Sequence, residues 1–217
     1  FFDRILKRTQ AASEQDHLRL IIDNNTRIPD RNINARAGGP SPGPALAASA
    51  RGLEQAGAEF IVMACNTAHA WESDIRAAIS IPFLSIVDET VKAVADLRPK
   101  AAGVLAGDAC AAAGLYQNAL KRAGVACIMP DADTQKSLME LIYRIKSGDT
   151  GDTGETARRA AATVARKLEA QGAEAIIAGC TEIPIVLAAD DIDGELVSST
   201  DVLVERTILF AGGELKA

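Results

Sequence analysis

Residues 53–65 read LEQAGAEFIVMAC, and residues 168–180 read LEAQGAEAIIAGC. Seven of the thirteen positions are identical, and they include the glycine and the final cysteine, Cys65 or Cys180. Each copy has the pattern of a helix end, a glycine stop and a short apolar strand. The repeat therefore predicts two related halves, each with a cysteine just past the carboxyl end of a strand.

Outside the repeat, short apolar runs alternate with helical segments, which is typical of a parallel α/β fold. Strands are predicted at 18–23, 60–64, 83–86, 102–106, 125–129 and 175–178, and helices at 44–56, 68–79, 89–96, 114–123, 135–146, 153–171 and 202–210. We expect two αβ domains related by a pseudo-twofold axis, with mainly parallel sheets and a cleft between them. One domain would comprise residues 1–97 plus 198–217, and the other residues 98–197. Helical spacing begins at Phe2, which predicts a further segment upstream.

The composition excludes several classes of protein. Of the 217 residues, 24% are charged and 48% hydrophobic, which is a globular profile. The net charge of −6 disfavours binding to nucleic acid or to an anionic membrane surface. Apolar runs stay below the roughly 18 residues of a membrane helix. Four dispersed cysteines without a CxxC motif, and only two histidines, indicate neither a disulfide framework nor a zinc site and favour the cytoplasm.

Two cysteines at strand ends suggest a specific chemistry. Ligands of open α/β sheets bind outside the carboxyl ends of strands, so we expect Cys65 and Cys180 to face one cleft. A thiolate on one face of a carbon and a thiol on the other can remove and return a proton with inversion. Helix N-termini after each cysteine, with the side chains of Asn66, Thr67 and Thr181, would stabilise the anion and lower the thiol pKa toward neutrality. The alternative is that both cysteines only fill space.

The remaining candidates carry weaker signals. His69 lies one helical turn after Cys65, where it would tune the thiolate, bond a backbone carbonyl or be purely structural. Cys127 is expected in the core. Cys110 follows a strand end and is expected to be structural, although that position would also let it line the cleft.

Several segments resemble the aspartate/glutamate racemase superfamily, and within it the aspartate racemases. The segments that carry the resemblance are Asn24-Asn25, Ile28-Pro29-Asp30-Arg31, Cys65-Asn66-Thr67-Ala68-His69-Ala70, Gly114-Leu115-Tyr116, Ile142-Tyr143-Arg144-Ile145-Lys146 and Gly179-Cys180-Thr181-Glu182. Glutamate racemases typically have histidine where this chain has Glu182, which favours the aspartate branch.

The resemblance implies that the chain interconverts L- and D-aspartate, with glutamate as a further possibility, as a homodimer that needs no cofactor or metal. It implies that Cys65 and Cys180 are the two bases. It also implies a set of substrate-binding residues, in which the two basic side chains hold the acidic substrate: Asn24, Arg31, Asn66, Thr67, Lys146, Thr181 and Glu182.

The chain also departs from the family pattern. Gly107, Asp108 and Cys110 stand where relatives usually have threonines, and Ser198 stands where an aspartate is common. An Asp108 carboxylate that faced the cleft would repel a dicarboxylate. Two alternatives to a racemase therefore stay open: a related decarboxylase or cis–trans isomerase of a small dicarboxylic acid, and a non-catalytic pseudoenzyme that binds an acidic ligand.

Overall fold

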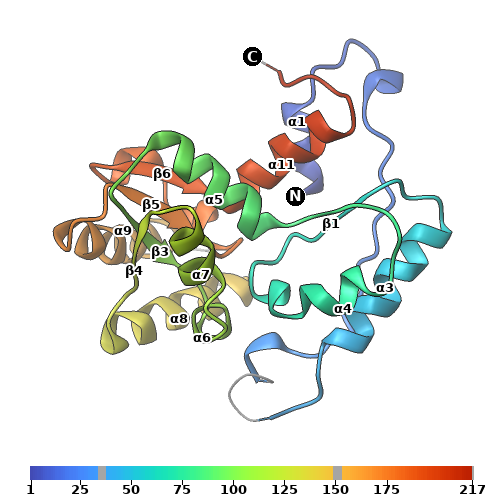
Figure 1. Ribbon diagram of the computed structural model, residues 1–217. Helices are drawn as coiled ribbons and strands as arrows, with labels where there is room; N and C mark the ends of the chain where they lie inside the picture. Colours follow the sequence, from blue (N-terminus) through green and yellow to red (C-terminus); the bar gives the residue numbers. More distant parts are fainter. Residues whose placement is uncertain (34–37, 149–152, 217) are drawn as a thin grey trace.

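A computed structural model describes residues 1–33, 38–148 and 153–216 (Figure 1). The α-helices are α1 (Phe2–Arg8), α3 (Gly43–Gln55), α4 (Glu72–Arg76), α5 (Ile86–Leu97), α6 (Asp108–Ala112), α7 (Leu115–Arg122), α8 (Ala132–Lys146), α9 (Thr153–Ala170), α10 (Ile183–Val186) and α11 (Ser199–Phe210). Short 3-10 helices are η1 (Glu14–Asp16), η2 (Thr67–Trp71) and η3 (Ala189–Asp191). The strands are β1 (Ile61–Val62), β2 (Phe83–Leu84), β3 (Ala101–Leu105), β4 (Ala126–Ile128), β5 (Ala175–Ala178) and β6 (Glu195–Ser198).

The larger sheet has four parallel strands in the order β4-β3-β5-β6. Successive residues of a strand face opposite sides, so Leu105 and Ile176 pack against α8 and α9 on one face. Val104 and Ile177 pack against α5, α7 and α11 on the other face. With both faces covered, its central strands are apolar throughout, as parallel sheets require.

The smaller sheet pairs β1 with β2 in parallel, with Ile61 opposite Phe83. Its core is built with α3 and α4, which contribute Leu46, Ala50 and Ile75. Figure 1 shows β1, α3 and α4 as a group beside the body built on the four-stranded sheet. The predicted α/β fold with parallel sheets is confirmed.

The repeat has a structural cause at the helix ends. The backbone N–H of Ala58 donates to the carbonyl of Leu53 at 3.0 Å, and that of Gly57 donates to Glu54 at 2.9 Å. In the second copy, between α9 and β5, the backbone N–H of Ala173 donates to the carbonyl of Leu168 at 3.1 Å, and that of Gly172 donates to Glu169 at 2.8 Å. This is the Schellman motif, which needs a residue at positive φ. Gly57 has φ 93° and Gly172 has φ 101°, so only glycine fits both positions without strain.

Some predicted elements were wrong or incomplete. Residues 18–23 are not a strand. Among the described residues, no strand pairing involves this segment, although it lines a groove together with Phe60–Val62. The single helix expected at 68–79 is a 3-10 turn followed by α4, which ends at Arg76. The strand β6 and the helix α6 were not predicted.

The helices α5 and α11 pack on the four-stranded sheet, and their buried residues Ile86, Val94 and Leu203 share its core. The sequence analysis had grouped both helices with the first domain. The proposed domain boundaries stay a prediction, but the core places the turn between β2 and α5 as the crossing from the small sheet to the large one.

Candidate functional site

Both repeat cysteines lie just beyond the carboxyl ends of their strands. Cys65 follows β1 and begins a turn into η2, with its backbone N–H bonded to the carbonyl of Met63 at 2.8 Å. Cys180 follows β5, and its carbonyl accepts the N–H of Ile183 at 3.0 Å. Both side chains are half-buried free thiols. The following helices are short, five residues in η2 and four in α10, so little helix dipole acts on either sulfur.

Lys146, at the end of α8, is close enough to both cysteines for its charge to interact with each sulfur. Burial lowers the pKa of Lys146, but the Glu182 carboxylate, with a smaller effect of the cysteines in their thiolate form, outweighs it and raises the pKa. Arg31 also lies within electrostatic reach of Lys146. The structure thus gathers Cys65, Cys180, Lys146 and Arg31, from four separate segments, around one place.

Glu182 has contacts with three of the predicted residues. Its Oε2 accepts the Cys180 Sγ–H at 2.9 Å and the Thr181 hydroxyl at 3.2 Å. Its Oε1 lies 3.5 Å from the Lys146 Nζ. Burial, followed by the charge and hydrogen bond of Glu182, raises the pKa of Cys180 well above its ordinary value. The expectation that helix N-termini would lower the pKa of Cys180 toward neutral pH was therefore wrong. A carboxylate beside the sulfur favours the uncharged thiol and raises its pKa instead.

Asn66 lies in a buried hydrogen-bond chain. The Tyr116 hydroxyl donates to Asn66 Oδ1 at 2.6 Å, and Asn66 Nδ2 donates to Ser199 Oγ at 3.0 Å. Ser199 in turn donates to the carbonyl of Ala178 at 2.8 Å. Asn66 is 2% exposed and Tyr116 1% exposed. The Asn66 amide therefore ties the turn after Cys65 to α7, α11 and the end of β5.

The segment that carries Arg31 docks on α6. Asp30 Oδ1 accepts the backbone N–H groups of Asn32 and Ile33 at 2.7 and 2.9 Å. Asn32 Oδ1 accepts the N–H of Ala109 at 3.3 Å. Arg31 itself donates to the carbonyl of Pro29 at 3.4 Å. Asn24, by contrast, is exposed, and within the part of the chain that the structure describes no contact places it with the others.

The residues that depart from the family pattern have defined places. Asp108 Oδ1 accepts the amide of Gln135 at 2.8 Å, which holds this carboxylate toward α8. Gly107 lies beside Thr67, since a Cβ on it would lie 3.6 Å from the threonine hydroxyl. Cys110 is buried, and burial, with a smaller effect of Cys65, raises its pKa to about 12. Ser198 caps α11 by accepting the N–H of Asp201 at 3.2 Å.

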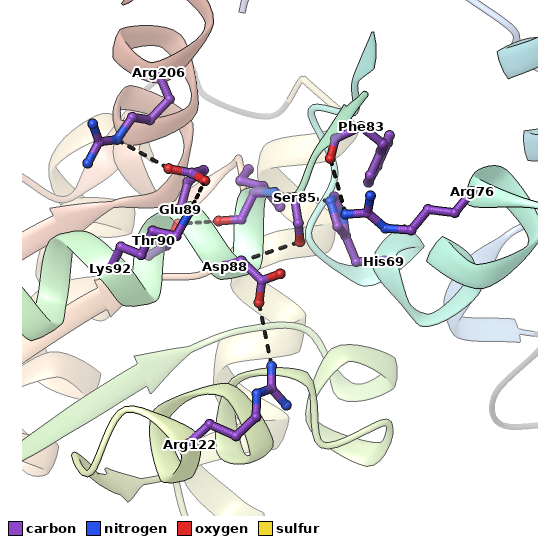
Figure 2. A network of polar contacts seen from close by, with 11 residues as sticks. His69, Arg76, Phe83, Ser85, Asp88, Glu89, Thr90, Lys92, Arg122 and Arg206 are labelled. Carbon is purple, nitrogen blue, oxygen red and sulfur yellow. Dashed lines mark hydrogen bonds and ion pairs between the residues drawn. The ribbon is translucent and has the colours of Figure 1, made fainter. Parts of the chain in front are cut away.

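His69 is hydrogen-bonded to the backbone of Cys65. Its Nε2 accepts the N–H of Ile86 at 3.1 Å, so Nδ1 carries the hydrogen and donates to the Cys65 carbonyl at 2.8 Å. Burial lowers the pKa of His69 and keeps it neutral. Figure 2 shows its ring beside Phe83, whose carbonyl accepts from Arg76 at 3.1 Å. Of the three roles considered for His69, the bond to a backbone carbonyl is confirmed.

Figure 2 also shows ion pairs that join α5 to α7 and to α11. Arg122 of α7 lies 3.5 Å from Asp88 of α5, and Arg206 of α11 lies 3.2 Å from Glu89. The Arg122–Asp88 pair is largely exposed and is worth about 0–1 kcal/mol, whereas the Glu89 side chain is only 14% exposed. The two ion pairs join α7 and α11 to α5, whose first residue, Ile86, donates its backbone N–H to His69 Nε2.

Sequence reasoning missed two residues of this site, Asn32 and Ser199, and it did not foresee that Tyr116 is buried and bonded to Asn66. The one available signal was the tyrosine, because a buried phenol needs a hydrogen-bond partner. Within the described ranges, no group of three or more His, Cys, Asp or Glu side chains could hold a metal ion. No helix among those residues is long and apolar enough to cross a membrane.

Comparisons with known proteins agree with this arrangement. A family model described as Asp/Glu/Hydantoin racemase matches residues 1–207. The chain is 32% identical over 158 residues to the broad specificity amino-acid racemase RacX of Bacillus subtilis (strain 168), covering 72% of this chain and 66% of that protein. It is 31% identical over 140 residues to an uncharacterized protein in the pnlA 3' region of Pectobacterium carotovorum subsp. carotovorum, covering 64% of this chain and 91% of that one. Among solved structures, the aspartate racemase of Picrophilus torridus superposes with a TM-score of 0.87 at 27% identity, over 99% of this chain and 89% of that one.

Proposed function

Because the chain belongs to the Asp/Glu/hydantoin racemase family, we propose that it racemises aspartate by proton transfer between Cys65, Cys180 and the Cα of the substrate. The observation that carries the proposal is the position of the two cysteines, each past the end of a parallel strand and each within electrostatic reach of Lys146. Structural likeness to an aspartate racemase supports aspartate as the first substrate to test.

In the proposed reaction, one sulfur as thiolate removes the Cα proton and becomes a thiol. The other sulfur, as thiol, gives its proton to the opposite face of the same carbon and becomes a thiolate. The intermediate carries extra negative charge on the α-carboxylate, so nearby donors must stabilise it. The Thr67 and Thr181 hydroxyls are assigned to the α-carboxylate and amino group, and Arg31 with Lys146 to the side-chain carboxylate.

We propose a different role for one of the predicted residues. The Asn66 amide is bonded on both sides within the protein, so we assign it to positioning the Cys65 turn. Asn24 lies on an exposed stretch, and its role in substrate binding remains a prediction. No cofactor is invoked, since the two thiols and the cations supply the acid, the base and the charge stabilisation. A homodimer in the cytoplasm is part of the same proposal, and light scattering tests the dimer.

Broad specificity is a second candidate, and one contact favours it. Glu182 lies 3.5 Å from Lys146, so one of the two cations expected to hold a side-chain carboxylate is already partly neutralised. The similarity to a broad specificity racemase points the same way. Neutral amino acids therefore belong in the substrate panel beside aspartate and glutamate.

The test is loss of the Cα–H signal by proton NMR in D₂O without added cofactor, starting from each enantiomer. Exchange and inversion of aspartate are expected for the wild type, and near-complete loss of inversion for Cys65→Ser and Cys180→Ser. Cys127→Ser is the matched control, because Cys127 lies on β4. Full racemisation by either single variant would refute the two-base mechanism, and faster inversion of neutral amino acids would select the second candidate.

A further inference from the structure

The segments that follow the two repeat copies differ two residues after the cysteine. Two residues after Cys65 the chain has Thr67, whereas two residues after Cys180 it has Glu182. A hydroxyl is neutral at any ordinary pH, while a carboxylate carries a charge. The pseudo-symmetric pair is therefore built with unequal neighbours.

Glu182 is held by the protein on both oxygens. Oε2 accepts from Cys180 and Thr181, and Oε1 lies 3.5 Å from Lys146. Its side chain is only 16% exposed. A carboxylate held in this way is directed at the sulfur, and it would have to leave these partners to bind a substrate.

The other groups that face Cys180 do not cancel this effect. Lys146, from α8, and the backbone N–H of Glu182 favour the thiolate. Tyr116, from α7, lies within electrostatic reach of Cys180, but burial raises its pKa strongly and keeps it neutral. Burial and the Glu182 charge both favour the thiol, and together they outweigh Lys146.

We propose that Glu182 is a positioning residue that holds Cys180 as a thiol in the resting enzyme, so that Cys65 starts as the base and Cys180 as the acid. The inference rests on the proposed racemase function and deepens it. In a turnover from this state, Cys65 takes the Cα proton and Cys180 releases its own proton to the opposite face. The thiolate left on Cys180 then lies beside the Glu182 carboxylate, and proton exchange with water restores the resting state.

This inequality has a kinetic signature. The equilibrium constant between enantiomers is 1, so kcat/KM must be the same for both. The enantiomer whose Cα–H faces Cys65 meets the favoured state of the enzyme, and its kcat and KM should therefore differ from those of the other enantiomer by a common factor. Removing the Glu182 charge should bring that factor closer to 1, whereas a merely structural defect would lower both rates together.

The direct test measures the alkylation of each cysteine by iodoacetamide against pH, with peptide mass spectrometry to separate Cys65 from Cys180. Only the thiolate reacts, so the midpoint of the profile reports the protonation of each sulfur. In Glu182→Gln, the Cys180 midpoint should fall by about 1 to 3 pH units, the usual effect of one adjacent charge. Glu182→Asp should retain most of the high midpoint. Glu140→Gln, which removes an exposed carboxylate of α8, is the control and should leave it unchanged.

An unmoved Cys180 midpoint in Glu182→Gln, or an equal shift in Glu140→Gln, would overturn the proposal. Should Glu182→Gln fail to fold, the wild type alone can still overturn the proposal, because the proposal requires Cys65 to be alkylated at lower pH than Cys180, and Glu182→Asp then tests the carboxylate. The opposite order would refute the assignment. Labelling is done without substrate, so it tests the role of Glu182 separately from the racemase function that the D₂O exchange tests. Either proposal can be refuted while the other stands.

Discussion

Removing the hydroxyl of Tyr116 should destabilise the protein through a partner 50 positions away. In Tyr116→Phe the Oδ1 of Asn66 loses its 2.6 Å hydrogen bond while it remains 2% exposed. A buried acceptor left without a donor costs about 1–3 kcal/mol. The phenyl ring keeps its packing, so the loss comes from the hydroxyl, which bonds to Asn66 and also interacts with Thr90 and Ser199. We therefore expect the free energy of unfolding to fall by about 1–3 kcal/mol.

Urea denaturation followed by circular dichroism measures this change. The midpoint should fall with an unchanged m-value, since the native surface is the same. The melting temperature should fall by about 2–4 °C for each kcal/mol at this chain length. Tyr143→Phe is the matched control, because Tyr143 is 41% exposed and its loss should stay within about 0.5 kcal/mol.

A double-mutant cycle locates the cause. If Tyr116 acts through Asn66, Tyr116→Phe should cost much less in an Asn66→Ala background, with a coupling energy of about 0.5–3 kcal/mol. Equal stability of Tyr116→Phe and Tyr143→Phe, or strict additivity in the cycle, would refute the role assigned to the buried chain.

Three further outcomes follow from the surroundings of single residues. Stability should fall as the pH drops below about 6.5, because unfolded His69 takes up a proton near its ordinary pKa, whereas burial lowers the pKa of the folded residue. Unfolding midpoints measured at pH 5.5 and 7.5 should differ less in His69→Gln than in the control His17→Gln. An equal difference in the two variants would contradict this reasoning. Gly103→Ala should destabilise by about 1–3 kcal/mol, because the new Cβ would lie 2.8 Å from a methyl group of Ile176, and an unchanged urea midpoint would show that the core can move aside. Gly52→Ala should instead stabilise by about 0.5–1 kcal/mol, because Gly52 is inside α3 with nothing within 4 Å of the new methyl; a lower melting temperature would show that the helix is strained there.

Much of the fold followed from local pattern. The apolar runs at β4 and β5 each follow a helix that ends in a glycine, Gly124 or Gly172, and those signals depend on residues only a few positions apart. The strand β6 was missed because a four-residue run, Glu195–Ser198, merges into a serine-rich helix cap. Residues 18–23 failed for the opposite reason, since an apolar extended run becomes a strand only when another backbone is close enough to pair with it.

The sequence by itself determined that two cysteines follow two matched strands, because the repeat, the Schellman glycines and the strand ends are local features. Only the tertiary structure decided what surrounds each sulfur. It directed the Glu182 carboxylate at Cys180, placed Lys146 within reach of both thiols, and bonded Asn66 to Tyr116. The physical reason is that burial, charge and hydrogen bonding act across space between segments far apart in the chain. Two cysteines that look equivalent in the sequence thereby acquire different neighbours in the fold.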